Sequence, residues 1–389
     1  MIVSRVQTFS VTHIKLRQFY TAGPFFILYD CEALNYRRDE QLFELVNKNH
    51  MVLPGGNKLM EEPYVDLVID QRKANEIKTL TMADTLITTS QKESDEIRKL
   101  IPDRNIKVVG HALDPKTLKT KKGFGERNGI LFIGSFNNVM YYNGDAIWYF
   151  LTEVYPLIIE EAKDPIPLTV VGRGIPEELN EVVTYSPQLA PYVTLIESPP
   201  SIEELYESHR IFIAPHLYGA GIQYKISETM VMGVPVVMSE LSASSFGFSK
   251  DSDITCVGEN PQKFKDCVIR VHDNKSKWEA LRKRGLEFID KTHDARLIQS
   301  TWSKVIRKGF QTIKLVRETN SQPQHDLFNA HFEYPTKECP EGEDNYFYNY
   351  PDVEENVKGP RNVTSAFEHF ITYGIHEARN YVCVRDESE

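Results

Sequence analysis

The feature that most constrains the fold is a regular alternation of short apolar runs with amphipathic segments between about residues 128 and 239. The apolar runs do not alternate with polar residues, so both faces of each expected strand are covered. The alternation therefore predicts a doubly wound parallel sheet, whose ligands bind outside the carboxyl ends of its strands. The runs that predict strands are 128–135, 167–174, 192–198, 210–215 and 234–239.

A shorter alternation precedes this region. Apolar runs at 25–30, 84–90 and 106–114 predict three strands of a second parallel sheet within residues 1–112. After the regular region, residues 318–343 are polar and carry prolines, so we expect a linker there. The aromatic-rich tail at 344–389 predicts a small helical module.

Composition excludes some classes of function. The formal net charge is −10 and the sequence pI is about 5.7, so we expect no nucleic-acid partner. The five cysteines show no C-x-x-C spacing, which argues against a disulfide framework and favours a reducing compartment. No apolar run reaches the length of a membrane span. We therefore expect a cytoplasmic protein.

The stretch "YGAGIQYKISETMVMGVPVV" at 218–237 carries the clearest binding signal. Gly219 and Gly221 lack the Cβ atoms that would keep a phosphate from the backbone, and the next helix turns its N-terminus toward the same point. Lys225 adds a positive charge, and Glu228 is suited to accept hydrogen bonds from a ribose diol. This pattern predicts a site for a nucleoside diphosphate.

A plainer interpretation stays open. Many glycine turns merely join a strand to a helix, and Lys225 with Glu228 can be a surface pair three residues apart. The stretch has neither the spacing of a P-loop nor that of a G-x-G-x-x-G fingerprint.

The same stretch resembles the donor-site segment of GT-B-fold, family-4-like glycosyltransferases, in the G-A-G-I variant of their E-x7-E motif. The resemblance covers about residues 1–315. It implies an α/β fold of GT-B type, with two Rossmann-like domains and a small C-terminal helical appendage. It also implies that residues 1–112 form a partial acceptor-side domain and residues 113–317 a donor domain. Four more stretches carry it in the family's order: 29–38, 83–93, 129–158 and 168–174.

The resemblance implies retaining, metal-independent transfer of a sugar from a nucleoside-diphosphate donor to a glycan or lipid-linked acceptor, with no other cofactor. Glu228 matches the glutamate associated with the donor's ribose, and Gly221 and Ile222 match amides that face the diphosphate. His216 either contacts the sugar or merely packs beside a strand end. No catalytic residue is assigned, and peripheral membrane contact stays open. The residues placed at the donor site are Gly134, Ser135, Arg173, His216, Gly219, Gly221, Ile222, Lys225 and Glu228.

The chain departs from the family pattern at several positions. Ala220 stands where the motif has its first glutamate, and Gln223 stands where many variants have lysine. Ser135 replaces an arginine, and Asn35 replaces a cleft histidine, so Asn35 cannot act as a general base. About two dozen residues precede the run at 25–30, where the family has several β/α units. We therefore expect a truncated chain or an acceptor half that is supplied differently.

Three rival functions follow from these departures. A noncatalytic nucleotide-sugar or glycan-binding protein would keep the donor site without turnover. Asp251 and Asp253 form a D-x-D pattern, which in the other glycosyltransferase fold holds a divalent cation. An epimerase of the same fold would need cleft carboxylates that the sequence does not reveal.

Overall fold

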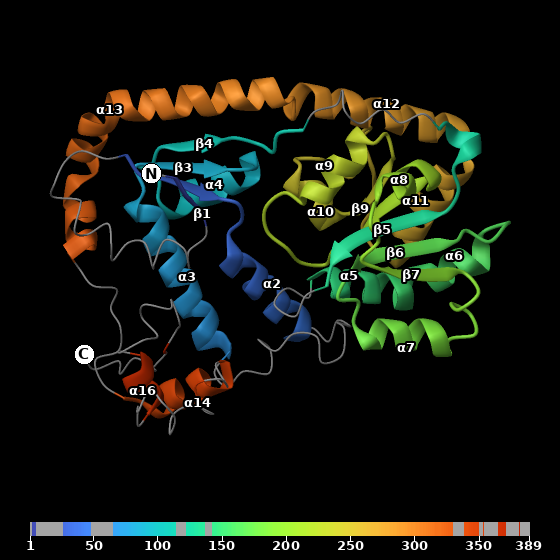
Figure 1. The fold of residues 1–389 in the computed structure, drawn as a ribbon, viewed down its shortest axis with the longest axis horizontal. Helices are drawn as coiled ribbons and strands as arrows, with labels where there is room; N and C mark the ends of the chain where they lie inside the picture. The colour runs from blue at the N-terminus through green and yellow to red at the C-terminus, as the bar shows by residue number, and fades with distance from the viewer. Residues whose placement is uncertain are drawn as a thin grey trace.

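The chain folds into two lobes, each built on a parallel β-sheet (Figure 1). The predicted α/β class with two parallel sheets is confirmed. The computed structural model describes residues 2–4, 26–47, 65–113, 122–136, 142–329, 338–349, 353, 365–370 and 381.

The N-terminal lobe contains a four-stranded parallel sheet in the order β1-β2-β3-β4. Leu28 pairs with Thr85, and Leu86 pairs with Ile106, so the carboxyl ends of the strands meet at one edge. The strands are β1 (Ile2–Ser4), β2 (Leu28–Cys31), β3 (Thr85–Thr88) and β4 (Ile106–Val108). Its helices are α2 (Asn35–Asn47), α3 (Val65–Met82) and α4 (Gln91–Leu100).

Helix α3 was not expected from the sequence. Its buried face includes Glu76 and Thr79, so the apolar periodicity that marks an amphipathic helix is interrupted. Glu76 accepts hydrogen bonds from the backbone amides of Asn35 and Tyr36, at 3.0 and 2.9 Å. These are amides at the start of α2, so the buried carboxylate caps that helix.

The C-terminal lobe contains a six-stranded parallel sheet in the order β10-β9-β8-β5-β6-β7. Strand β5 pairs with both β6 and β8, so the direction of winding reverses between β5 and β8. A crevice for a ligand forms at such a switch point, outside the carboxyl ends of the two strands. The strands are β5 (Ile130–Ser135), β6 (Leu168–Arg173), β7 (Val193–Glu197), β8 (Ile211–Ala214), β9 (Val236–Ser239) and β10 (Cys256–Gly258).

Helices cover both faces of this sheet, over two separate apolar clusters. The helix expected near 144–162 is present, but a π-helical turn interrupts it. The helical elements are η2 (Phe124–Glu126), α5 (Tyr142–Tyr149), η3 (Phe150–Val154), α6 (Tyr155–Glu161), α7 (Glu177–Tyr185), α8 (Glu203–Ser208), α9 (Tyr224–Val231), α10 (Glu240–Ser245), α11 (Pro261–Asp273) and α12 (Lys275–Thr292).

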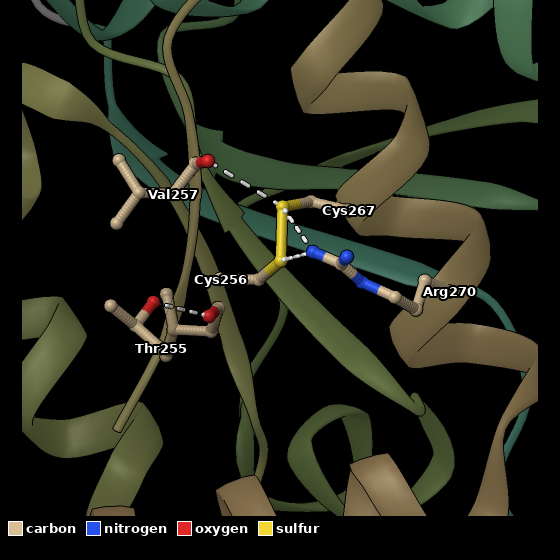
Figure 2. Close-up of a disulfide and its surroundings, with 6 residues drawn as sticks. Thr255, Cys256, Val257, Cys267 and Arg270 are labelled. Carbon is tan, nitrogen blue, oxygen red and sulfur yellow. Dashed lines mark hydrogen bonds between the residues drawn. A yellow bond between two sulfur atoms is a disulfide. The ribbon is translucent and has the colours of Figure 1, made fainter. Parts of the chain in front are cut away.

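The expectation that the cysteines form no disulfides is wrong. Cys256 in β10 and Cys267 in α11 are joined by a disulfide, with their Cα atoms 5.7 Å apart (Figure 2). Helix α11 follows β10 along the chain and packs back on it, which brings the two side chains together. Cys339 is also disulfide-bonded. The argument from the cysteines for a reducing compartment therefore loses its basis.

Helix α13 (Ala295–Asn329) leaves the C-terminal lobe and runs along the N-terminal lobe (Figure 1). It covers an apolar cluster on the four-stranded sheet, and Trp302, Val305, Ile306 and Ile313 pack against that cluster. The expected linker at 318–343 is thus helical as far as Asn329 and again from Pro340. The expected assignment of 295–317 to the donor half does not hold, because α13 buries its apolar side on the other sheet. In the part of the chain that the structure describes, no helix is long and apolar enough to cross a membrane.

The tail contains two short helices, α14 (Pro340–Asn349) and α16 (Ala366–His369), as expected for a helical module. They share a small apolar cluster that includes Tyr346, Phe370 and Tyr381. The carboxylate of Glu343 accepts hydrogen bonds from the amides of Ala366 and Phe367, both at 2.8 Å, and so caps α16.

Candidate functional site

The candidate site lies at the switch point of the six-stranded sheet. Gly134 and Ser135 are the last two residues of β5, and β8 ends at Ala214. His216 follows β8 by two residues, and the glycine-rich loop then leads into α9. The sequence-predicted residues of this stretch therefore converge where a doubly wound sheet offers its crevice.

Asn143, in the first turn of α5, connects these parts. Its Nδ2 donates a hydrogen bond of 2.7 Å to the carbonyl oxygen of Ser135. Its Oδ1 accepts a hydrogen bond from Lys225 Nζ and lies 3.2 Å from His216 Nε2. A Cβ at Gly134 would come within 3.0 Å of the Asn143 amide carbon, so Gly134 leaves room for this contact. One side chain thus joins the end of β5, the loop after β8 and α9.

The ammonium of Lys225 lies in an aromatic setting. Its Nζ is 4.7 Å from the ring centre of Phe132 and 5.8 Å from that of Tyr142. Burial disfavours the charged form and lowers the pKa of Lys225 to about 7. An anion placed beside it would favour the ammonium and raise that pKa again. Lys225 is therefore poised to gain a full charge when an anionic ligand binds.

His216 packs inside the site. Its side chain is fully buried, and its ring centre lies 6.0 Å from Phe132 and 5.7 Å from Tyr142. Burial, and next the charge of Lys225, hold its pKa well below the usual range, so the ring is neutral. Ser239 Oγ also donates to its carbonyl oxygen, at 2.7 Å. In this structure His216 positions Asn143.

Glu228 faces away from Lys225. Its Oε2 accepts a hydrogen bond of 3.1 Å from the hydroxyl of Tyr206 in α8, and burial raises its pKa. Lys225 donates to Asn143 instead, and within the described residues the two side chains form no ion pair. They are therefore not the surface pair that the plainer interpretation allows. The Lys225 ammonium lies at the switch point, and the Glu228 carboxylate lies further along α9.

Arg173 and Ser135 lie on the exposed rim of the crevice, at the ends of neighbouring strands β6 and β5. Beside them, Glu197 accepts hydrogen bonds from the amides of Gly174 and Ile175, at 2.8 and 3.0 Å. These bonds fix the turn after β6 and leave the Arg173 side chain on the rim.

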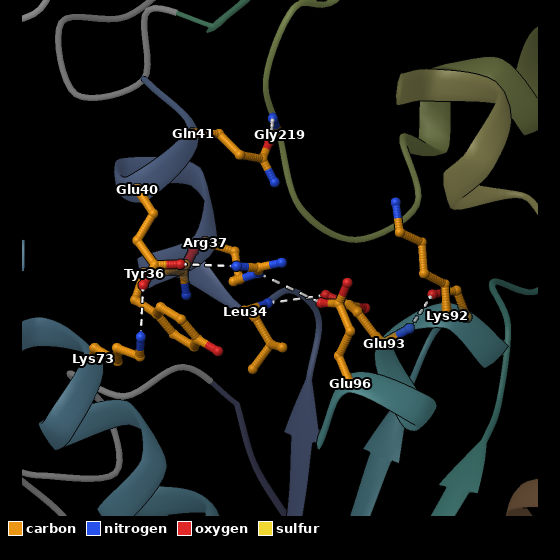
Figure 3. Close-up of polar contacts among 12 residues, drawn as sticks. Leu34, Tyr36, Arg37, Glu40, Gln41, Lys73, Lys92, Glu93, Glu96 and Gly219 are labelled. Atoms are coloured by element: carbon orange, nitrogen blue, oxygen red, sulfur yellow. Dashed lines mark hydrogen bonds and ion pairs between the residues drawn. The ribbon is translucent and has the colours of Figure 1, made fainter. Parts of the chain in front are cut away.

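The glycine-rich loop is held by the N-terminal lobe. The amide of Gly219 donates a hydrogen bond of 3.0 Å to Gln41 Oε1 of α2, a pair labelled in Figure 3. The backbone of Gly221 lies near the carboxylate of Glu93 and acts to lower its pKa. The expectation that the Gly221 amide faces a diphosphate stays a prediction. Ile222 follows in the same loop and is partly exposed.

Gly221 also lies close to the other lobe. Its φ is +71°, and a Cβ there would lie 2.4 Å from the carbonyl oxygen of Glu32. Both facts require glycine. The motif glycine therefore serves the contact between the lobes in this structure.

Glu93 is a functional candidate that the sequence did not reveal. Its buried carboxylate also accepts a hydrogen bond of 2.9 Å from the amide of Leu34, and burial raises its pKa to about 7. Its own amide donates to Ser90 Oγ at 3.1 Å. A serine followed three residues later by glutamate is the ordinary signature of a helix N-terminus. The sequence therefore explains Glu93 as part of a helix cap and does not indicate that its carboxylate also binds the amide of Leu34.

The D-x-D pattern lies apart from this site. Asp251 and Asp253 are both exposed, and Asp253 forms an ion pair with Arg284 of α12. Among the described residues, no group of three or more histidine, cysteine, aspartate or glutamate side chains is arranged to hold a metal ion.

Comparison with known proteins places the site in a family context. Residues 127–274 match the model of a family described as glycosyl transferases group 1. A Klebsiella pneumoniae protein, named an uncharacterized 44.6 kDa protein in the cps region, is 28% identical over 180 residues. That match covers 44% of this chain and 44% of that protein, which is less than half of the relative's length.

Two solved structures show the likeness of the fold. Sucrose-phosphate synthase from Thermosynechococcus elongatus is 15% identical, with a TM-score of 0.58 over 80% of this chain and 73% of that chain. HepE from Anabaena, solved in complex with UDP and glucose, is 12% identical, with a TM-score of 0.55 over 79% of this chain and 78% of that chain. The chain therefore has the Rossmann-like GT-B fold of glycosyltransferases, and residues 127–274 carry its similarity to the group 1 family.

Proposed function

We propose that the protein is a retaining, metal-independent glycosyltransferase of the family-4-like, G-A-G-I type. It moves a sugar from a nucleoside-diphosphate donor to a glycan or lipid-linked acceptor. The observation that carries the proposal is the Lys225 ammonium, which Asn143 and two aromatic rings hold at the switch point. The group 1 match at 127–274 includes this part of the chain. The Anabaena neighbour was solved with UDP and glucose, which supports a nucleotide-sugar donor.

In the proposed complex, the donor's diphosphate lies between the end of β5 and the start of α9. The bond from the sugar's anomeric carbon to the diphosphate breaks, and negative charge develops on the departing phosphate. The Lys225 ammonium and the amides at the α9 N-terminus stabilise that charge. The acceptor oxygen forms the new bond on the same face, and its proton passes to the departing phosphate. Glu228 accepts the ribose hydroxyls, and Tyr206 orients its carboxylate.

Donor binding requires a rearrangement of the glycine-rich loop. The Gly221 backbone lies near the Glu93 carboxylate, so a phosphate can approach that amide only when the carboxylate leaves. We infer that the two lobes separate at this contact to admit the donor. The relative encoded in a cps region is consistent with a role in polysaccharide synthesis.

The test is thermal denaturation of the full chain with UDP, GDP, dTDP and ADP. A ligand that binds only the folded state at a hundredfold excess over its Kd stabilises it by about 2.7 kcal/mol. We expect one nucleotide to raise the melting temperature of the wild type and to lose this effect in Glu228→Gln. The matched control is Glu181→Gln, which changes an exposed glutamate of α7 and should keep the effect. The absence of a shift with all four nucleotides would contradict the proposal.

A second function is favoured by one observation. Ala220 stands where the motif has its first glutamate, so the carboxylate expected near the donor sugar is missing. A noncatalytic nucleotide-sugar-binding protein would tolerate this loss. It would bind one nucleotide as above and yet release no free nucleotide when given the corresponding sugar donor and a panel of acceptors. Release of nucleotide that depends on the acceptor excludes this alternative.

A further inference from the structure

Arg38 of the N-terminal lobe reaches the switch point of the other lobe. Its Cζ atom lies 5.0 Å from the ring centre of Tyr142, the first residue of α5. The same ring centre is 5.8 Å from Lys225 Nζ and 5.7 Å from the ring centre of His216. Two cations, one from each lobe, therefore lie beside one aromatic ring. The donor site described above includes Lys225 but not Arg38.

The face of α2 that carries Arg38 is directed at the glycine-rich loop. Gln41 follows Arg38 by three residues, so the two side chains share a face of the helix. Gln41 accepts the hydrogen bond of 3.0 Å from the Gly219 amide. Figure 1 shows α2 on the side of the N-terminal lobe that faces α5. Separate contacts to Tyr142 and to Gly219 thus place this face of α2 at the crevice.

The start of α2 is anchored by a buried group. The Glu76 carboxylate accepts hydrogen bonds from the amides of Asn35 and Tyr36, at 3.0 and 2.9 Å. Arg38 lies in the same first turn of the helix. Its side chain therefore extends from a well-held backbone, and it is partly exposed, so a ligand in the crevice can reach it.

A diphosphate at the switch point needs more than one positive charge. Among the described residues there, His216 is neutral, Ser135 and Gln223 carry no charge, and Lys225 is a buried cation. A nucleoside diphosphate carries more than one negative charge, which a single ammonium does not balance. Arg173 lies on the exposed rim, where water and salt screen its charge.

A guanidinium is well suited to this role. It stays charged, its planar fork donates two parallel hydrogen bonds to phosphate oxygens, and it stacks on an aromatic ring. Arg38 has other interactions in the free protein, including the attraction of the Asp39 carboxylate. That carboxylate forms an ion pair of 3.2 Å with Arg72. A diphosphate carries more charge than one carboxylate that is already paired, so it is the stronger partner for the guanidinium.

We propose that Arg38 is a second cation of the donor site, which the N-terminal lobe supplies when the two lobes meet over the donor. Its guanidinium binds oxygens of the donor's diphosphate opposite Lys225. The inference rests on the proposed function and adds a binding residue from the other lobe. It follows that the diphosphate couples donor binding to the approach of the lobes.

The experiment measures the binding of UDP, GDP, dTDP and ADP to the full chain by calorimetric titration. We expect Arg38→Gln to weaken binding of the diphosphate that the wild type prefers by about tenfold. Arg38→Lys keeps the charge but loses the fork, so its affinity should fall between the two. The matched control is Arg98→Gln, which changes an exposed arginine of α4 in the same lobe and should bind as the wild type does.

Salt dependence separates a lost phosphate contact from a structural defect. Affinity should decline less steeply with rising salt in Arg38→Gln than in the wild type, because one charge contact is missing. A structural defect would lower the affinity by the same factor at every salt concentration. Unchanged affinity in Arg38→Gln, a loss with the salt dependence of the wild type, or an equal loss in Arg98→Gln would overturn the inference.

The two proposals fail in different ways. If none of the four diphosphates binds the wild type, the proposed function fails and this inference fails with it. If a diphosphate binds, and Glu228→Gln weakens its binding but Arg38→Gln does not, the proposed function stands and the inference alone fails.

Discussion

The ammonium of Lys225 lies beside two aromatic rings and one amide oxygen. In this environment its charge depends on pH. Its pKa falls from 10.5 to about 7 because burial removes water from the charge. Between these two values the unfolded chain binds a proton that the folded chain does not. The contribution of Lys225 to folding stability therefore rises as the pH rises through this range.

The same shift predicts proton uptake when a nucleoside diphosphate binds. At about pH 8 most Lys225 side chains in the free protein are neutral, and a diphosphate beside them restores the ammonium. Calorimetric titration in buffers of different ionisation enthalpy measures the protons taken up. Lys225→Arg is the control, since its guanidinium stays charged and should take up none. Uptake that is equal in both proteins would contradict this role of Lys225.

The sequence identified the residues of the donor site that belong to one stretch, but not the partners that orient them. Gly219, Gly221, Lys225 and Glu228 follow a local pattern of glycines and charges. Asn143 comes from α5, distant along the chain; it lies within the stretch 129–158 that carries the resemblance, but nothing local indicates its contact with Lys225. Such partners depend on the packing of separate elements, so a single sequence carries no signal for them.

Among the elements, the loop from β8 to α9 allows a matched test of glycine. Gly221 and Gly247 both have positive φ, at +71° and +75°. A Cβ at Gly221 would meet the Glu32 carbonyl at 2.4 Å, whereas nothing lies within 4 Å of a Cβ at Gly247. Gly247→Ala should therefore cost only the strain of the left-handed backbone, about 1 kcal/mol. Gly221→Ala should cost clearly more, because the contact between the lobes must also move.

Chemical denaturation of both variants measures this difference in the free energy of unfolding. Gly221→Ala should also lose the response to nucleotide, and Gly247→Ala should retain it. Equal destabilisation by the two substitutions would show that the contact with Glu32 does not constrain the loop.

The disulfide between β10 and α11 predicts a second difference in stability. It closes a loop of 11 residues by sequence separation and fastens an edge strand to the helix that covers it. Replacing Cys256 and Cys267 together by alanine should lower the free energy of unfolding by about 2–3 kcal/mol. Denaturation without reductant measures this loss, and Cys31→Ala controls for the change of a buried thiol. Free thiols at both positions in the oxidised protein would contradict the prediction.

Elements with a strong apolar pattern could be predicted, and elements shaped by polar contacts could not. The strands of the regular alternation are continuous apolar runs, so five of the C-terminal sheet's strands were expected. Strand β10 is short, and α3 buries a glutamate and a threonine on its inward face, so neither shows a clear period. The sequence predicts a linker at the end of α13 because polar residues and Pro323 suit a loop as well as an exposed helix.

For the molecule as a whole, helix α13 determines how the lobes are joined. A substitution at Gly309 tests how this helix packs on the N-terminal lobe. A Cβ at Gly309 would lie 2.2 Å from the ring of Phe26 in the N-terminal lobe. Gly309→Ala improves helix propensity, yet it should lower the free energy of unfolding by about 1–3 kcal/mol through overpacking. Gly285→Ala in α12 is the control, since its Cβ would meet Met230 at an ordinary 3.7 Å.

Gly285→Ala should be neutral or stabilising by up to about 1 kcal/mol. Phe26→Leu combined with Gly309→Ala should recover part of the loss, since the smaller side chain makes room. Thermal or chemical denaturation of the wild type, Gly309→Ala, Phe26→Leu and the double variant completes the cycle. If Gly309→Ala is as stable as Gly285→Ala, α13 does not rest on Phe26 as the structure shows.

The relation between the lobes was beyond the reach of the sequence. The hydrogen bond from Gly219 to Gln41 and the close approach of Gly221 to Glu32 join residues far apart along the chain. The contact between Arg38 and Tyr142 likewise joins the two lobes. These contacts depend on long-range packing, and none leaves a local pattern of residues.

The course of α13 has a further consequence for the contact between the lobes. A helix that is rooted in one lobe and packed on the other acts as a tether, so the lobes meet as if at a high effective concentration. Their direct contact can then consist of a few polar bonds that would not hold two separate molecules together. The crevice between the lobes can then open and close repeatedly while α13 keeps the two lobes aligned.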